Sequence, residues 1–218
     1  MNSVLYNEIN SEITRLITNT NVYATRTAID KLYEIYILTC VLQSLRNLGC
    51  ALEARDSNDN LTTNFEFRLS PGYIFSPITS SSFVYFTFNN LEYELHNGVR
   101  TLGRASVLHE LDVAIIERDE AIRCRSNNIH PRQSKIKFLA ECKFYGADLP
   151  LHIGREFLGL CSEFNVRVKS IVSNVGSNNI HKLLTSHKQT VNFELTPLNS
   201  DRIDIFIKWM TNELRQVL

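Results

Sequence analysis

Two short segments place acidic and basic side chains at a spacing that could bind a cation and a phosphate. Residues 108–116 and residues 135–145 both alternate between apolar and polar side chains. Because successive side chains of a strand point to opposite faces, Glu141 and Lys143 share one face of their strand, and Asp112 lies on the polar face of the other. If the strands are neighbours, two carboxylates and an ammonium converge on one side of a sheet. Such a group suits a hard divalent cation and the phosphate that it serves.

This arrangement resembles the PD-(D/E)XK nuclease superfamily, which has the restriction-endonuclease-like fold. In that family an aspartate ends one strand and a Glu-X-Lys triplet lies on the next strand. Asp112 and Glu141-Cys142-Lys143 stand at the matching positions, and Leu111 replaces the proline of the name. The alternative interpretation is that these side chains are solvated polar positions on half-exposed strands.

The resemblance implies Mg²⁺-dependent hydrolysis of DNA phosphodiester bonds, with Mn²⁺ able to substitute and RNA not excluded as a substrate. Asp112, Glu141 and the backbone carbonyl of Cys142 would bind the metal ion. Lys143 would orient the attacking water and stabilise charge on the phosphate. A lysine with an ordinary pKa of about 10.4 is a poor base, so the electrostatic role is favoured.

A further candidate, Glu34, lies on a helix predicted over residues 27–48. Apolar residues follow helical spacing through this segment, and Gly49 suits its C-terminal end. A glutamate on the first helix often extends the metal site in the superfamily, so the resemblance adds Glu34 to the catalytic and metal-binding residues. The alternative is that Glu34 lies on the solvent face with Lys31 and pairs with a lysine or an arginine.

Basic residues gather in the segment 118–134, which we interpret as a polar loop between the two motif strands. A basic loop beside a carboxylate site would suit a phosphate backbone. The alternative for this segment is a solvated hairpin loop. For Arg155, on the helix that follows the Glu-X-Lys strand, the alternative is a surface ion pair. The candidates for nucleic-acid contacts are Arg123, Arg125, Arg132, Lys135 and Arg155.

The expected elements define an α/β (α+β) fold with a mixed central sheet flanked by helices. Their order is a helix, a strand at 50–55, the insertion, the aspartate strand, the Glu-X-Lys strand, a helix and a strand, which resembles the α-β-β-β-α-β core of the restriction-endonuclease-like fold. We expect one domain, 1–218, with a core at 27–56 and 105–174, a β-rich insertion at 57–104 and a C-terminal elaboration at 175–218. Within the insertion, we expect a strand at 64–68 and a hairpin that turns at Asn89-Asn90.

Composition restricts the class of protein. The 218 residues are 44% hydrophobic and 21% charged, with no net charge. A protein that coats nucleic acid is usually basic, so any DNA affinity must come from a focused groove or a partner. No apolar run approaches the roughly 20 residues of a membrane span. The lack of such a run predicts no membrane partner. The five scattered cysteines lack zinc-ligand spacing and predict reduced thiols in a cytoplasmic protein.

Three functional hypotheses follow. The first is a metal-dependent DNA endonuclease, in restriction or phage defence, that acts as a homodimer or as a subunit of a defence complex. The second is a catalytically degenerate nuclease-fold subunit that binds nucleic acid or a partner protein. The third is an unrelated α/β binding module.

Overall fold

The computed structural model describes residues 2–16, 29–76 and 81–218. The helices are α1 (Asn2–Leu16), α2 (Ile29–Asn47), α3 (Arg118–Asn127), the 3-10 turn η1 (Gln133–Lys135), α4 (Leu151–Glu163), α5 (Asn178–Ser186) and α6 (Ser200–Val217). The strands are β1 (Leu52–Arg55), β2 (Phe83–Phe88), β3 (Leu91–Leu102), β4 (Leu108–Glu117), β5 (Ile136–Lys143), β6 (Val168–Ser173) and β7 (Thr190–Asn192). None of the helices in these ranges is long and apolar enough to cross a membrane.

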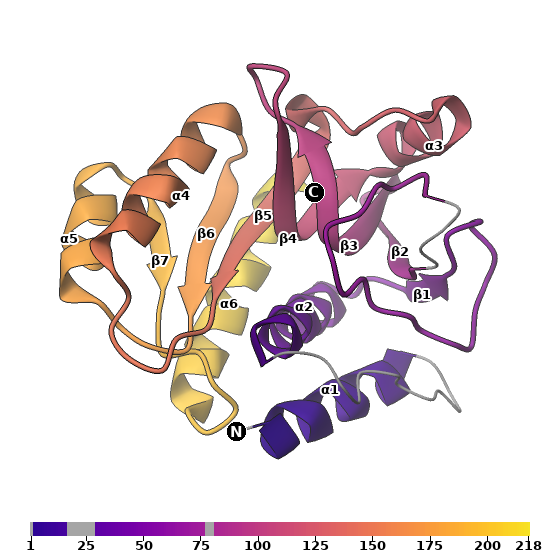
Figure 1. Ribbon diagram of the computed structural model, residues 1–218. Coiled ribbons are helices and arrows are strands. Elements are labelled where there is room, and N and C mark those ends of the chain that lie inside the picture. Colours follow the sequence, from indigo (N-terminus) through magenta and orange to yellow (C-terminus); the bar gives the residue numbers. More distant parts are fainter. Residues whose placement is uncertain (1, 17–28, 77–80) are drawn as a thin grey trace.

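The strands form one mixed sheet in the order of the sequence, from β1 to β7 (Figure 1). Neighbouring strands from β1 to β5 are antiparallel. The pairs β5–β6 and β6–β7 are parallel, and helices α4 and α5 make the connections between them. The predicted α/β class with a mixed sheet is therefore confirmed.

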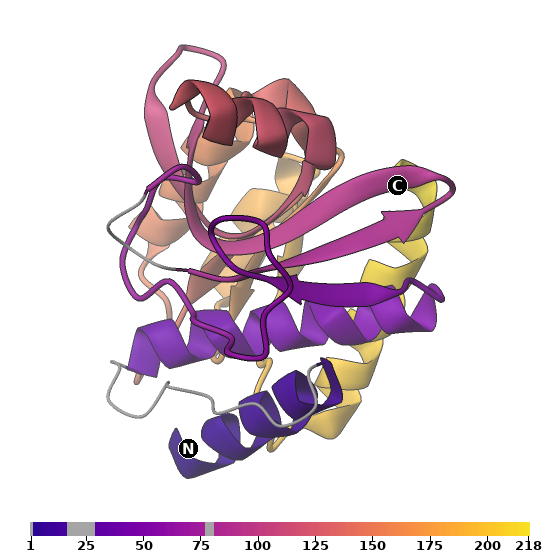
Figure 2. The same cartoon turned by 90° about the vertical axis from the view of Figure 1, so that its right-hand side faces the viewer.

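Helices cover both faces of this sheet. Figure 2 shows helix α2 beneath the strands β1 to β3, helix α1 beneath α2, and helix α3 on the opposite face. One cluster of buried apolar residues joins α1, α2 and α6 to the sheet. A second cluster joins α3, α4 and α5 to the other face. The sheet is thus enclosed between two cores.

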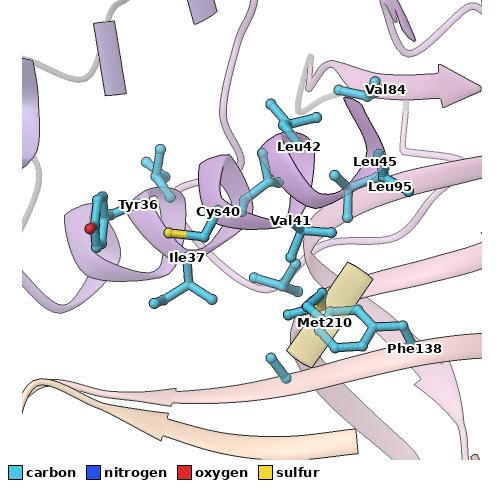
Figure 3. Packing of buried hydrophobic residues seen from close by; sticks show 14 of the residues in the cluster. Tyr36, Ile37, Cys40, Val41, Leu42, Leu45, Val84, Leu95, Phe138 and Met210 are labelled. Atoms are coloured by element: carbon cyan, nitrogen blue, oxygen red, sulfur yellow. The ribbon is translucent and has the colours of Figure 1, made fainter. Parts of the chain in front are cut away.

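Helix α2 is the central helix of the first core. Thirteen of its 19 residues are buried, and apolar side chains lie all round it, as expected for a helix enclosed on every side. Figure 3 shows Val41 and Leu45 among residues of the sheet and α6. The helix ends at Asn47, and Gly49, predicted as the stop signal, follows with a φ of +83° that lets the Cys50 N–H reach the Leu45 carbonyl at 3.1 Å.

The segment predicted as an insertion belongs to the central sheet. Strand β3 pairs with β4 along nearly its whole length, and the hairpin before it turns at Asn89 and Asn90, both with positive φ. The neighbour of the aspartate strand is therefore β3, and the strand expected in that place, β1, lies two strands further away. Consecutive strands tend to pair, and the length of β3 extends that pairing along β4.

Two local predictions are wrong. Residues 64–68 form no strand. A backbone N–H of this segment binds a side chain and not the backbone of a neighbouring strand: the Arg68 N–H donates to Asn97 Oδ1 at 3.2 Å. Phe65 is nonetheless buried. The supposed loop after β4 begins with helix α3. Its first turn carries acidic residues and its last turn a basic one, which the helix dipole favours.

The packing of α2 can be tested with Leu45→Ala. Leu45 is 0% exposed, so we expect the free energy of unfolding to fall by about 2–5 kcal/mol through lost burial and a cavity. Leu61, which is 71% exposed, supplies the matched control, and Leu61→Ala should change stability by less than about 0.5 kcal/mol. Urea unfolding followed by circular dichroism measures both. Equal losses in the two variants would contradict the central position of α2.

Candidate active site

Strands β4 and β5 separate next to the predicted motif. The pairing between them begins at Ile116 and Ile136 and ends at Val113 and Ala140. Beyond that point β4 remains paired with β3 as far as Leu108, and β5 remains paired with β6. The two strands therefore diverge while each stays in the sheet.

Asp112 lies where the strands diverge. Its Oδ2 accepts a hydrogen bond of 2.7 Å from the backbone N–H of Cys142, so a side chain takes the place of the next rung of the ladder. The residue is 7% exposed. In a strand, the N–H and C=O of one residue point to the same side. The Cys142 carbonyl, predicted as a metal ligand, therefore faces the same opening.

A residue with an unusual backbone conformation lies opposite Asp112 in β3. The register places Gly98, whose φ is +54°, between the pairs Asn97–Val113 and Val99–Leu111. Leu111 belongs to the core beneath α4, whereas Val113 belongs to the core beneath α2. The predicted single alternation along residues 109–115 is therefore wrong at this point, and Asp112 faces α2.

A cavity of about 400 Å³ opens at the divergence. It contains all four side chains predicted for the site: Glu34 from α2, Asp112 from β4, and Glu141 and Lys143 from β5. The other lining residues are Asp30, Lys31, Glu110, Cys142, Phe144 and Tyr145. Segments almost 80 residues apart in the chain thus place their carboxylates around one cavity.

Two lysines pair with these carboxylates. Lys143 Nζ lies 2.6 Å from Glu141 Oε1. Lys31 Nζ lies 2.9 Å from both oxygens of Glu34 and 3.3 Å from Glu110 Oε1. The alternative prediction for Glu34 is therefore right that it pairs with a basic residue, which is Lys31. It is wrong about the position, because Glu34 is buried in the cavity wall and does not lie on the solvent face.

Burial and repulsion between carboxylates raise the pKa values of two of the acidic groups, Asp112 and Glu34. Burial raises the pKa of Asp112 well above its usual range, and the charges of Glu141 and Glu34 add to this effect. Burial raises the pKa of Glu34 to about 7, although Lys31 opposes the change. Burial lowers the pKa of Lys143, but Glu141 and Asp112 outweigh it, so the net shift is upward. Perturbed groups of this kind in a cleft are typical of functional sites.

The donor set fits a hard divalent cation in its chemistry. It offers carboxylate and carbonyl oxygens, which Mg²⁺ and Mn²⁺ prefer. Among the described residues no group of three His, Cys, Asp or Glu side chains is arranged to hold a metal ion directly. Glu34 and Glu141 contact lysines instead. Binding would therefore require these side chains to turn toward Asp112.

A second cavity, of about 370 Å³, lies on the α4 side of the same strands and shares Glu110, Glu141 and Lys143 with the first. Helix α4 contributes Glu156 to its lining, whereas Arg155 is exposed and lines neither cavity. Neither Glu110 nor Glu156 was predicted as a site residue. Glu110 could have been, because it lies two residues before Asp112 on the same strand and therefore on the same face.

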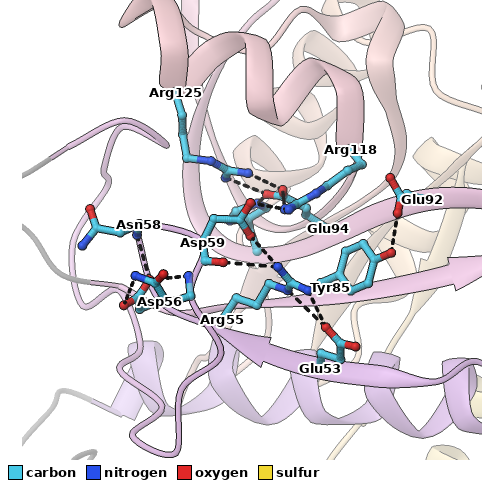
Figure 4. A network of polar contacts seen from close by, with 12 residues as sticks. Glu53, Arg55, Asp56, Asn58, Asp59, Tyr85, Glu92, Glu94, Arg118 and Arg125 are labelled. Carbon is cyan, nitrogen blue, oxygen red and sulfur yellow. Dashed lines mark hydrogen bonds and ion pairs between the residues drawn. The ribbon is translucent and has the colours of Figure 1, made fainter.

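The expectation that a basic loop adjoins the carboxylates is wrong. The connection between β4 and β5 lies at the far end of β4, five residues beyond Asp112 or about 17 Å along the strand. Its basic residues pair with acidic ones there. Arg125 and Arg118 bind the fully buried Glu94, as Figure 4 shows. Further pairs are Arg123–Glu120, Arg132–Glu120 and Lys135–Glu117, at 2.6, 2.7 and 2.5 Å.

Neither a comparison with models of protein families nor a comparison with curated proteins finds a match for this chain.

Asp112→Asn tests whether burial of the Asp112 charge lowers the stability of the folded chain. A carboxyl group with a raised pKa binds more protons in the folded chain than in the unfolded chain. Its contribution to stability therefore falls as the pH rises from the pKa of the unfolded chain to that of the folded chain. The amide retains an acceptor for the Cys142 N–H but carries no charge. We expect Asp112→Asn to raise the melting temperature relative to wild type at about pH 8, and by less at about pH 5.

Differential scanning fluorimetry resolves this difference, since 1 kcal/mol shifts the melting temperature by about 2–4 °C in a domain of this size. Asp201→Asn, at an exposed position of α6, is the matched control and should show no such trend. A pH-independent difference, or a variant less stable than wild type at the higher pH, would contradict the unfavourable burial of the Asp112 charge.

Proposed function

We propose that this chain is a member of the PD-(D/E)XK superfamily and hydrolyses DNA phosphodiester bonds with Mg²⁺. One observation carries the proposal: Asp112 and the Glu141-X-Lys143 triplet, on strands that diverge, line one cavity with Glu34 of α2. A chance Glu-X-Lys triplet on a half-exposed strand has no reason to meet two further buried carboxylates.

The order of elements supports the same proposal. Helix α2 is followed by the antiparallel run β3–β4–β5, then by α4 and the parallel strand β6. This sequence of elements is that of an α-β-β-β-α-β core, with β3 in the place first expected for residues 50–55. The strands β1, β2 and β7 then extend the sheet at its two edges.

In the proposed mechanism, Asp112, Glu141 and the Cys142 carbonyl would hold the metal ion, and Glu34 would extend the ligand set. A divalent ion bound there would neutralise charge that develops on the phosphate and would make the attacking water more acidic. Lys143 keeps its proton at neutral pH, because its pKa is raised. It therefore orients the water and stabilises negative charge on the phosphate, and it does not serve as the general base.

Substrate affinity requires more than this cavity. The chain has no net charge, and three of the four arginines predicted to contact DNA, Arg123, Arg125 and Arg132, are paired with Glu94 or Glu120. Cleavage of both strands of a duplex requires two active sites, so we propose a homodimer or a subunit of a restriction or defence complex. We place the enzyme in the cytoplasm, where its five free thiols would remain reduced.

A plasmid-nicking assay with Mg²⁺ or Mn²⁺ tests the proposal. We expect Asp112→Ala, Glu141→Ala and Lys143→Ala each to lower the nicking rate at least about 100-fold while the chain stays folded. The exposed residues Asp201 and Lys208 of α6 supply control variants, and Asp201→Ala and Lys208→Ala should cleave like wild type. Near wild-type nicking by any one site variant would remove that residue from the catalytic set.

The position of Glu34 leads to a separate prediction. Glu34→Gln should lower the affinity for Mg²⁺ and the nicking rate, because one negative ligand is lost while helix propensity hardly changes. A Mg²⁺ titration of nicking measures both quantities. An unchanged half-saturation and rate would limit Glu34 to a structural pairing with Lys31.

The second candidate function is a degenerate nuclease-fold subunit that binds nucleic acid or a partner protein. It is favoured by the lysine contacts of Glu34 and Glu141, which leave no ready-made metal-binding group among the described residues. Salt-dependent DNA binding without cleavage in any divalent ion would select this function. The same assay on RNA decides between the two nucleic acids.

A further inference from the structure

We propose that the ammonium group of Lys31 is a built-in cation that competes with the divalent ion for Glu34 and thereby sets the metal affinity of the site. This inference rests on the proposed function, since it concerns the same cavity. Lys31 belongs to neither the aspartate strand nor the Glu-X-Lys triplet.

The contacts of Lys31 are those of a cation among ligands. Its Nζ lies 2.9 Å from Oε1 and 2.9 Å from Oε2 of Glu34, and 3.3 Å from Oε1 of Glu110. The Glu34 side chain is only 7% exposed, and that of Lys31 is 19% exposed. The ammonium therefore occupies both oxygens of the one carboxylate that α2 supplies to the buried part of the cavity.

The charges of the cavity explain why a lysine is needed there. Asp30, Glu34, Glu110, Asp112 and Glu141 all line it, whereas Lys31 and Lys143 are its basic residues. Carboxylates in excess, partly removed from water, repel one another and require a cation. Lys31 supplies that charge from within the chain, from a position three residues before Glu34 on the same helix face.

The same contact opposes metal binding. A divalent ion that binds Glu34 beside Asp112 meets the positive charge of the Lys31 ammonium, which already contacts both oxygens, so the two cations repel each other there. The partial exposure of Lys31 and its flexible four-carbon stem give the ammonium a route to water. Two cations that compete for one carboxylate weaken each other's binding reciprocally.

Removal of the ammonium should therefore strengthen metal binding. Lys31→Met keeps an unbranched apolar stem but has no charge, so we expect the Kd for Mn²⁺, measured by calorimetry on the full chain, to fall about tenfold. Without metal this variant should melt below wild type, because Glu34 is left buried without its partner. Mn²⁺ should then raise its melting temperature by more than that of wild type.

Lys31→Arg tests the opposite direction. A guanidinium keeps the charge and can bind both oxygens of Glu34 as a planar fork, so we expect weaker Mn²⁺ binding than in wild type. A purely structural role for Lys31 would not give opposite changes in the two variants. This second variant also keeps the inference testable if Lys31→Met does not fold.

The matched control is Lys137→Met. Lys137 is also a partly exposed lysine in an ion pair, with its Nζ 2.8 Å from Glu117 Oε1, but it lies at the other end of β5. Its substitution should leave the Kd for Mn²⁺ unchanged.

The outcomes separate the inference from the proposed function. Mn²⁺ binding that is lost in Asp112→Asn but unchanged or weakened in Lys31→Met overturns the inference alone. Mn²⁺ binding that is unaffected by Asp112→Asn, or absent from both wild type and Lys31→Met, overturns the proposed metal site and the inference with it. Stronger binding in Lys31→Met together with weaker binding in Lys31→Arg supports both.

Discussion

The hydrogen bond from the Cys142 N–H to Asp112 Oδ2 is the interaction on which the candidate site depends. Where two strands diverge, backbone groups lose their ladder partners, and a buried unpaired group costs about 1–3 kcal/mol. The Asp112 carboxylate satisfies one such group and, by the same contact, is fixed at the opening. The divergence creates space for polar side chains, and the side chain that stabilises the divergence is also the central acidic group of the cavity.

Helix α2 supplies the second constraint. A helix with one apolar stripe could rotate or slide with little loss, but α2 is buried on nearly every side between the sheet, α1 and α6. Its apolar residues therefore fix its rotation as well as its depth. Glu34 and Lys31 have their positions set by that packing, since both precede the most deeply buried turns of the helix. Apolar residues outside the cavity thus fix the positions of Lys31 and Glu34 on the α2 side of the site.

The sequence contains the parts of this site that depend on local pattern. Strand alternation identified Asp112, Glu141 and Lys143, and helical periodicity identified the helix of Glu34, all of which line the cavity. The reversal of alternation at Gly98 was not predictable, because a glycine in a strand does not by itself reveal a positive φ. The partners of Arg118 and Arg125 were equally hidden: both pair with Glu94, which is more than 20 residues away and fully buried. Charge runs show which residues are basic, but not which carboxylate the fold brings to them.

The two ends of β4 show why one acidic cluster is interpreted as a site and the other as structure. Burial alone would raise the pKa of Glu94, yet hydrogen bonds from Arg125 and His96 lower it to about 2. That carboxylate is saturated by cations of the chain and gains nothing from a further one. At the diverging end, Asp112 and Glu34 are also buried, but their pKa values are raised, because the nearby lysines do not offset burial and repulsion. The same residue types therefore form a finished ion-pair network at one end of the strand. At the other end they form a cluster whose charge an added cation would stabilise. The contrast between the lowered pKa of Glu94 and the raised pKa values of Asp112 and Glu34 supports a metal-dependent function more than the Glu-X-Lys triplet itself does.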